Sequence, residues 1–189
     1  MTHEIIISGF GGQGVMAIGK TMVEAGMEEG LFVSWLMDGK EVSWLPSYGP
    51  EMRGGTANCS VVLSDQPVGS PVVLNPNELI AMNKPSLLKF EKEVLPGGII
   101  LINSSIVELK AQRSDVSAYY VPCIEIANDL GNPKVANMAM LGAYLEASGV
   151  LRPETVHKML AHIFHGPKAG LIDINIEAMS RGAACVSGG

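Results

Sequence analysis

Glycines recur near the beginning of the chain at a spacing that suits the binding of a phosphate group. Gly9, Gly11 and Gly14 follow a short apolar segment and precede a stretch with helical periodicity. Because glycine has no side chain, the backbone can approach an anion closely, and free N–H groups at a helix N-terminus point toward it. We therefore expect the backbone N–H groups of Gly11, Gly12, Gln13 and Gly14 to hold a phosphate.

The same spacing occurs in proteins that bind NAD or FAD, and the glycines alone leave that function open. Such proteins also carry an acidic residue at the end of the second strand, and Asp38 stands slightly beyond the strand expected at residues 32–36. Gln13 is unusual inside a dinucleotide-binding turn. A tight strand-to-helix turn without a ligand is a further alternative.

Residues 47–55 form a second segment whose residue types can bind an anion. Arg53 offers a fixed cation with several donors that suits phosphate or carboxylate, and Gly54 allows a sharp turn into the next strand. Tyr48 and Lys40 are weaker candidates in the same stretch. The sequence leaves open whether Arg53 binds a ligand or pairs with a local acid, and whether this segment lies near the glycine turn.

Other chemistry-bearing residues do not form a recognisable site. We expect no metal site and no catalytic residue in this chain, because no CxxC pair and no G-x-S-x-G sequence occurs. The histidines lack a carboxylate or cysteine at ligand spacing, and two of the cysteines stand in apolar settings that predict burial. These residues are His157, His162 and His165, and Cys59, Cys123 and Cys185.

The elements that must position these residues alternate between strands and helices. This alternation predicts a single α/β domain over residues 1–189, Rossmann-like, with a mostly parallel sheet flanked by helices. Continuous apolar runs such as residues 5–7 and 99–102 suit parallel strands that are buried on both faces. We expect strands at residues 4–8, 32–36, 56–63, 79–82, 99–102 and 119–121, and helices at 15–29, 85–94, 125–130, 135–148, 153–164 and 171–183.

Composition limits the classes of partner. The 189 residues are 47% apolar and 17% charged, with a formal net charge of −6, which argues against a nucleic-acid surface. No apolar run approaches the ~18 residues that a membrane span needs. The first residues lack a basic stretch, so we expect no signal peptide and a cytoplasmic protein. The 11 methionines indicate adaptable packing, either in a core or at a protein interface.

An ordered set of motifs along the whole chain resembles the gamma subunits of 2-oxoacid:ferredoxin oxidoreductases. The glycine turn is weak support by itself, whereas the ordered set is specific. The residues that carry the resemblance are the segments 8–15, 48–55, 70–71, 79–83, 96–98, 103–105, 126–127, 130–132, 137–138 and 141–143, followed by Asn175, Ala178 and Gly182.

The resemblance implies an enzyme that converts a 2-oxoacid by CoA-dependent oxidative decarboxylation to acyl-CoA, CO2 and reduced ferredoxin. It places thiamine diphosphate, Mg and 4Fe–4S clusters in partner subunits, and coenzyme A on this chain. It implies alpha and beta subunits as partners and leaves open whether there is a delta subunit. It also implies that ferredoxin interacts with the assembled complex. The segment around Arg53 resembles subunits that act on 2-oxoglutarate or branched-chain 2-oxoacids more than those that act on pyruvate.

The resemblance also gives the candidate residues a common ligand. Coenzyme A is strongly anionic, so the glycine turn would hold its pyrophosphate while Arg53 and Gly54 contact a phosphate. Asn137, near the beginning of a helix, would hydrogen-bond the ligand in the same cleft, although a helix-capping role is an open alternative. The chain would position the CoA thiol and would do no acid–base chemistry. Two other functions stay open: a stand-alone NAD- or FAD-binding module, and a non-catalytic assembly subunit with a methionine-rich surface.

Overall fold

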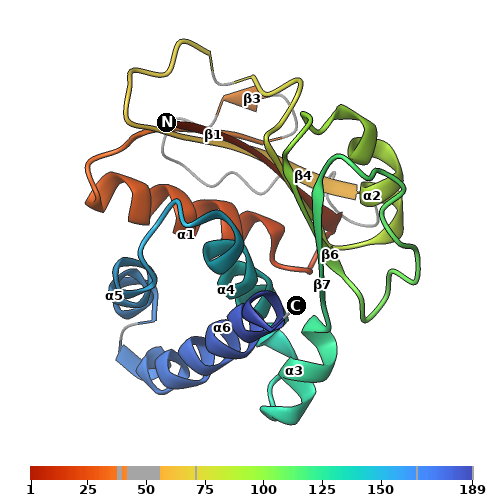
Figure 1. Ribbon diagram of the computed structural model, residues 1–189. Coiled ribbons are helices and arrows are strands. Elements are labelled where there is room, and N and C mark those ends of the chain that lie inside the picture. The colour runs from red at the N-terminus through yellow and green to blue at the C-terminus, as the bar shows by residue number, and fades with distance from the viewer. Residues whose placement is uncertain (38–39, 42–55, 71, 165, 189) are drawn as a thin grey trace.

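The computed structural model describes residues 1–37, 40–41, 56–70, 72–164 and 166–188, and Figure 1 shows their arrangement. Within these residues a seven-stranded sheet has the order β3-β2-β4-β1-β5-β6-β7. The strands are β1 (Thr2–Phe10), β2 (Phe32–Met37), β3 (Lys40–Glu41), β4 (Thr56–Ser64), β5 (Glu78–Ala81), β6 (Ile99–Asn103) and β7 (Ser117–Val121).

Most strands run in one direction. The pairs β1–β5, β5–β6 and β6–β7 are parallel, as continuous apolar runs predict. The strand β4 lies antiparallel between β1 and β2, so β2 still points the same way as β1 without touching it. The expected mostly parallel α/β sheet is confirmed, but the inserted β4 separates the first two strands, which are neighbours in a Rossmann unit.

Helices cover the two faces of the sheet unequally. In Figure 1, α1, α4, α5, α6 and α3 lie below the sheet, and α2 lies at its other side. The helices are α1 (Val15–Glu28), α2 (Lys84–Phe90), α3 (Cys123–Asp129), α4 (Ala136–Ser148), α5 (Pro153–Ile163) and α6 (Ile172–Ser187). Short 3-10 turns are η2 (Glu91–Glu93), η3 (Pro133–Val135) and η4 (Gly166–Leu171).

Alternate residues of β1 enter two different cores. Ile5 and Ile7 face the larger cluster, which includes α1 and α4, whereas Ile6 faces the smaller cluster with Leu87 of α2. This follows from the two-residue period of a strand. Both faces of β1 are therefore buried, and its carboxyl end is held in place from each side.

The helix α4 is buried on every side. Each residue from Asn137 to Leu145 is buried, because α4 packs against the sheet on one side and against α6 on the other. Two glycines permit the close crossing: a Cβ atom at Gly142 would overlap the carbonyl oxygen of Met179, and one at Gly182 would overlap that of Ala139. The Asn-x-x-Ala-x-x-x-Gly pattern on α6 is thus a packing motif.

The strand boundaries extend beyond the expected ones where polar residues find partners. Glu78 is buried and begins β5 one residue earlier than the sequence predicts. Its burial is possible because its carboxylate has hydrogen-bonding partners. His3 Nδ1 lies 2.5 Å from Glu78 Oε1, and the Tyr144 hydroxyl donates to Glu78 Oε2 at 2.7 Å. Burial, with a smaller contribution from Glu78, raises the pKa of Tyr144 well above its usual value, so the hydroxyl stays protonated and keeps donating.

Other departures from expectation are small. The sequence does not predict β3, α6 continues to Ser187 rather than to residue 183, and α3 begins at Cys123 rather than at residue 125.

In the described part of the chain, no helix combines the length and the apolar character needed to cross a bilayer. Most methionine side chains that the structure describes are in the core, so a methionine-rich surface is not what these residues form.

Candidate functional site: the glycine turn and its surroundings

The glycine turn lies at the carboxyl end of β1 and is fixed by the side chain of Gln13. Gln13 Oε1 accepts a hydrogen bond from the Phe10 N–H at 2.6 Å, and Gln13 Nε2 donates to the Met82 carbonyl at 3.1 Å. Gly9 leaves room for this bridge, since a Cβ atom there would lie 2.7 Å from Gln13 Oε1. The glutamine side chain therefore ties the turn to the end of β5.

Several backbone N–H groups of the turn are free to bind an anion. Gln13 N–H donates to the Phe10 carbonyl at 3.2 Å and is part of the turn itself. The N–H groups of Gly11, Gly12 and Gly14 have no acceptor among the described residues. The helix α1 starts immediately afterwards with no acidic residue in its first turn, so nothing there cancels the partial positive charge of its N-terminus.

Asn137 lies directly against this turn, although 123 positions separate it from Gly14 in the sequence. A Cβ atom at Gly14 would be 2.5 Å from Asn137 Nδ2, so the two residues are in contact. The side chain is 8% exposed and has no hydrogen-bond partner among the described residues. It does not cap α4, and the capping bond nearby comes from Asn132, whose Oδ1 accepts from the Lys134 N–H.

The remaining expected residues stand in a part of the chain that the structure does not describe. These are Asp38, Tyr48, Arg53 and Gly54, whereas Lys40 begins β3. The register of the sheet bears on their location, because Thr56 at the beginning of β4 pairs with Phe10 at the end of β1. The chain therefore enters β4 at the edge of the sheet that carries the glycine turn.

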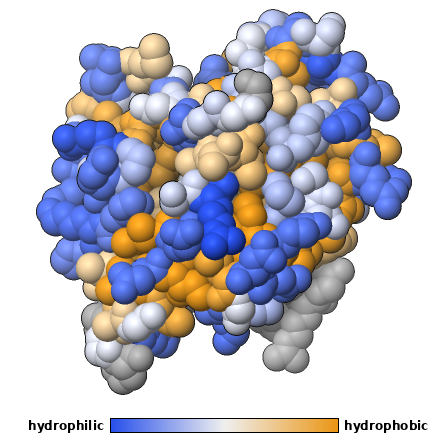
Figure 2. Space-filling model, turned by 60° about the horizontal axis from the view of Figure 1, so that its bottom comes forward, coloured by the Kyte–Doolittle hydropathy of each residue, from blue (hydrophilic) through white to orange (hydrophobic). Residues whose placement is uncertain are grey.

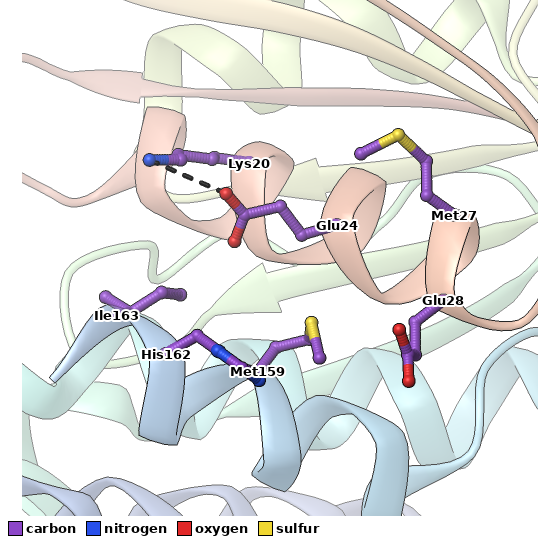
Figure 3. Close-up of a pocket in the computed structure, with 7 residues that line it drawn as sticks. All are labelled: Lys20, Glu24, Met27, Glu28, Met159, His162 and Ile163. Atoms are coloured by element: carbon purple, nitrogen blue, oxygen red, sulfur yellow. Dashed lines mark ion pairs between the residues drawn. The ribbon is translucent and has the colours of Figure 1, made fainter. Parts of the chain in front are cut away.

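Among the residues that the structure describes, two hollows border the exposed side of α1. One of about 340 Å³ lies between α1, the N-terminal end of α4, α5 and α6, and its polar lining consists of Lys20, Thr21, Asn132, Lys134, Asn137 and Asn175. The other, of about 520 Å³, lies between α1 and α5, and Figure 3 shows the residues that face it. It carries both signs of charge: Lys20 Nζ is 3.6 Å from Glu24 Oε1, and hydrogen bonding to Lys158 of α5 lowers the pKa of Glu28.

Metal-binding and nucleophilic groups are not gathered anywhere in the described ranges. No three histidine, cysteine, aspartate or glutamate side chains there come together as metal ligands. Cys59 and Cys123 are buried, as the sequence predicts, and Cys185 is half-buried. Burial raises the pKa of the Cys123 thiol, which makes it a poor nucleophile.

Lys20 and Lys134 are the residues near the site that the sequence did not reveal. They stand 114 positions apart, and each alone is an ordinary exposed lysine on a helix or turn. Only the packing of the N-terminal end of α4 beside α1 brings them to one cavity.

The fold and the turn together define an α/β protein with a phosphate-binding type of strand–turn–helix at the carboxyl edge of its sheet. Residues 4–185 match the family described as pyruvate ferredoxin/flavodoxin oxidoreductase. The chain therefore belongs to this family.

Named relatives agree with that assignment. The chain is 40% identical over 179 residues to the ketoisovalerate oxidoreductase subunit VorA of Methanothermobacter marburgensis, covering 94% of this chain and 35% of that protein. It thus spans about a third of VorA. It is 33% identical over 184 residues to the 2-oxoglutarate synthase subunit KorC of Methanocaldococcus jannaschii, covering 96% of this chain and 92% of KorC.

Solved structures have the same fold. The gamma subunit of a keto/oxoacid ferredoxin oxidoreductase from Geobacter sulfurreducens matches with a TM-score of 0.78 and 27% identity, over 99% of both chains. The 2-oxoglutarate:ferredoxin oxidoreductase from Magnetococcus marinus, solved with 2-oxoglutarate, coenzyme A and succinyl-CoA, matches with a TM-score of 0.84 and 21% identity, over 99% of this chain and 31% of that one.

Proposed function

We propose that this chain is the gamma component of a 2-oxoacid:ferredoxin oxidoreductase and that it binds coenzyme A at the glycine turn. The observation that carries the proposal is the contact between the turn and Asn137. It brings three free backbone N–H groups, the N-terminus of α1 and the side-chain amide of Asn137 to one place. The Asn137 amide is not among the fully buried polar atoms, so it is accessible to a ligand on the turn, to which it could donate or accept a hydrogen bond.

The pyrophosphate of coenzyme A suits this arrangement. Its oxygens accept hydrogen bonds only, and the N–H groups of Gly11, Gly12 and Gly14 can only donate. Gln13 contributes by fixing the turn through its side chain, because its own N–H is already used within the turn. The amide nitrogen of Asn137 can add a donor from the side of α4.

Arg53 and Gly54 complete the proposed site from the β4 side. Thr56 pairs with Phe10, and Arg53 precedes Thr56 by three residues, a span of at most ~11 Å of extended chain. An arginine side chain adds several ångströms to this span, so in our proposal the guanidinium of Arg53 would contact a phosphate held at the turn. In this role its guanidinium neutralises a phosphate through paired hydrogen bonds.

The contribution of the chain to the reaction is then positioning. Coenzyme A supplies the thiol that accepts the acyl group, and this chain holds the anionic part of the molecule still. The thiamine diphosphate, Mg and iron–sulfur clusters belong, in this proposal, to alpha and beta subunits and to any delta subunit. Fixing one reactant in place lowers the entropy cost of the transfer step.

The names of the relatives support the substrate class and the partners. VorA and KorC are subunits of enzymes named for ketoisovalerate and 2-oxoglutarate. These names favour a branched-chain 2-oxoacid or 2-oxoglutarate for the complex that contains this chain. Figure 2 shows apolar side chains exposed near the lower middle of the helical face and surrounded by hydrophilic ones, a surface that another subunit could cover. A reaction of this kind would take place in the cytoplasm.

The topology weakens the dinucleotide alternative. In a Rossmann unit the second strand lies beside the first, so the acid at its end reaches the ribose of a ligand on the glycine turn. Here β4 stands between β1 and β2, which moves the end of β2 one strand further away.

Calorimetric titration tests the proposal. Coenzyme A and NADH are each titrated into the purified chain and into the complex assembled with its partner subunits. The variants are Arg53→Ala and, as a control, Arg181→Ala, which removes the same charge from an exposed ion pair on α6. We expect saturable binding of coenzyme A that is weakened by Arg53→Ala and unchanged by Arg181→Ala. Saturable NADH binding without a response to coenzyme A, or no binding of coenzyme A even by the complex, would refute the proposal.

A further inference from the structure

The two faces of the sheet are covered very differently. The helices α1, α3, α4, α5 and α6 lie on one face, whereas α2, with seven residues, is the only α-helix of the described chain on the other. The smaller core on that side is closed by Leu87 of α2, by Val73 of the β4–β5 connection and by Val107 beyond β6. So short a helix leaves part of the surrounding apolar surface in contact with solvent.

Apolar side chains that face solvent lie around α2. Leu88 of α2 is 54% exposed, and Leu74 of the β4–β5 connection is 73% exposed. Leu95 lies beside the same connection, because its N–H donates to the Pro76 carbonyl at 2.9 Å. We call this region the α2 surface, and its exposed apolar members are Val72, Leu74, Leu88 and Leu95. Their chain neighbours pack together in one core cluster, namely Val73, Leu87 and Val94. An exposed apolar group of this kind is typical of a surface that another protein covers.

The α2 surface is also positively charged, in a chain whose net charge is −6. Its exposed lysines are Lys84, Lys89 and Lys92. Glu91 is the only acidic residue between positions 84 and 92, and its carboxylate is turned inward to accept the N–H groups of Gln112 and Arg113. Within the described ranges Lys84 and Lys89 make no ion pair, and Lys92 makes one 3.7 Å pair with Glu93. The surface is therefore complementary to an acidic partner.

Relatives of this chain indicate what kind of molecule covers such a surface. The chain spans 35% of VorA but 92% of KorC, so this domain is part of a longer protein in one relative and nearly a whole protein in the other. A domain that is covalently joined to its neighbour in one protein needs a binding surface for that neighbour where the two are separate chains. The remainder of VorA thus points to a protein partner rather than to a membrane.

We propose that the α2 surface binds the partner subunit that corresponds to the remainder of VorA, at a segment whose apolar side chains are flanked by carboxylates. The inference rests on the proposed function, because it takes this chain to be one component of a complex. Burial of Leu74 and Leu88 supplies most of the affinity, since apolar area leaves water there. The lysines at the rim attract the acidic flanks and disfavour basic partners.

The test measures how tightly this chain associates with its alpha and beta subunits, by dilution of the purified complex and size-exclusion chromatography. Leu88→Glu and Leu88→Ser place a charged and a neutral polar group on the α2 surface. Phe32→Glu is the control, because Phe32 is 48% exposed and begins β2, three places from β5 in the sheet. We expect Leu88→Glu to weaken association at least tenfold, Leu88→Ser to weaken it less, and Phe32→Glu to have no effect. Thermal unfolding of each isolated chain checks that the variants fold.

Ionic strength tests the charge of the partner. Lys89→Ala should weaken association about threefold at low salt, and this effect should shrink as the salt concentration rises. Lys168→Ala, which removes an exposed lysine of η4, should leave association unchanged at every salt concentration.

The outcomes separate this inference from the proposed function. Weakening by Leu88→Glu but not by Phe32→Glu supports the α2 surface as the contact. Unchanged association of Leu88→Glu, or equal weakening by Phe32→Glu, overturns the inference and leaves coenzyme A binding at the turn intact. Binding of the isolated chain to phosphatidylserine vesicles that Leu88→Glu abolishes, with subunit association unchanged, would also overturn it. Normal association in a complex that does not bind coenzyme A refutes only the proposed function, and a chain that does not associate with these subunits refutes both.

Discussion

The Gly14→Ala substitution places a methyl group at a position with a positive φ, which is unfavourable for any residue but glycine, and where Asn137 already lies. Gly14 has a φ of +78°, and a Cβ atom there would be 2.5 Å from Asn137 Nδ2 and 2.7 Å from Asn137 Cβ. Gly12 provides a matched comparison two residues earlier. Its φ is +90°, but nothing lies within 4 Å of its Cβ position. The two variants share the conformational cost and differ in the clash.

The geometry sets the expected magnitudes. An L-residue in the left-handed region costs roughly 1–2 kcal/mol, which is the whole expected effect of Gly12→Ala. Displacing a packed side chain adds about 1–3 kcal/mol, so Gly14→Ala should cost roughly 2–5 kcal/mol in the free energy of unfolding. For a chain of this length each kcal/mol lowers Tm by about 2–4 °C.

Urea unfolding of the two single variants measures this difference. The double variant Gly14→Ala/Asn137→Ala adds a second check, because it removes the amide and Cγ from the clash but keeps Asn137 Cβ. We expect it to be less destabilised than the sum of its single variants. Coenzyme A binding should fall more in Gly14→Ala than in Gly12→Ala.

Equal destabilisation at Gly12 and Gly14 would refute the reasoning. It would mean that Asn137 does not pack against the turn, and the strongest support for a shared site would be lost. Strict additivity in the double variant would lead to the same conclusion.

Other perturbations have equally specific consequences. Gly182→Ala should destabilise the protein by about 3 kcal/mol or more, because its methyl group meets backbone of α4, and a shift of the urea midpoint within error would contradict this close crossing. Tyr144→Phe should cost about 1–3 kcal/mol in thermal unfolding, since it leaves a buried oxygen of Glu78 without its donor; an unchanged Tm would show that water replaces the hydroxyl. Iodoacetamide followed by mass spectrometry should modify Cys185 before Cys123, because burial raises the pKa of both thiols but leaves Cys185 half-buried; the reverse order would contradict the packing of α3.

The sequence located the local elements well for a physical reason. Apolar runs and helical periodicity report which residues are buried, and Pro, Gly and polar clusters report where the chain turns. The helix α1 begins at Val15, where the glycine spacing places it, and β1 contains the expected residues 4–8. The glycine turn at the carboxyl end of a strand needed no tertiary information, because the strand, the turn and the helix are consecutive.

Partners of buried polar residues were less accessible from the sequence. The sequence predicts this strand from residue 79 onward, since acidic residues are rare in buried strands, whereas β5 begins at Glu78. Its burial depends on His3 and Tyr144, which come from β1 and α4. The strand β3 has two residues, too few for any periodicity to show.

The sequence by itself determined the class of fold, the glycine turn and, through its ordered motifs, the family. Tertiary structure decided which strand lies beside β1, because an apolar strand pairs equally well in either direction until the whole sheet selects one. It also decided that Asn137 touches Gly14 and that Lys20 and Lys134 share a cavity. Residues more than a hundred positions apart meet only through the packing of α4 against α1, and local sequence patterns carry no information about such contacts.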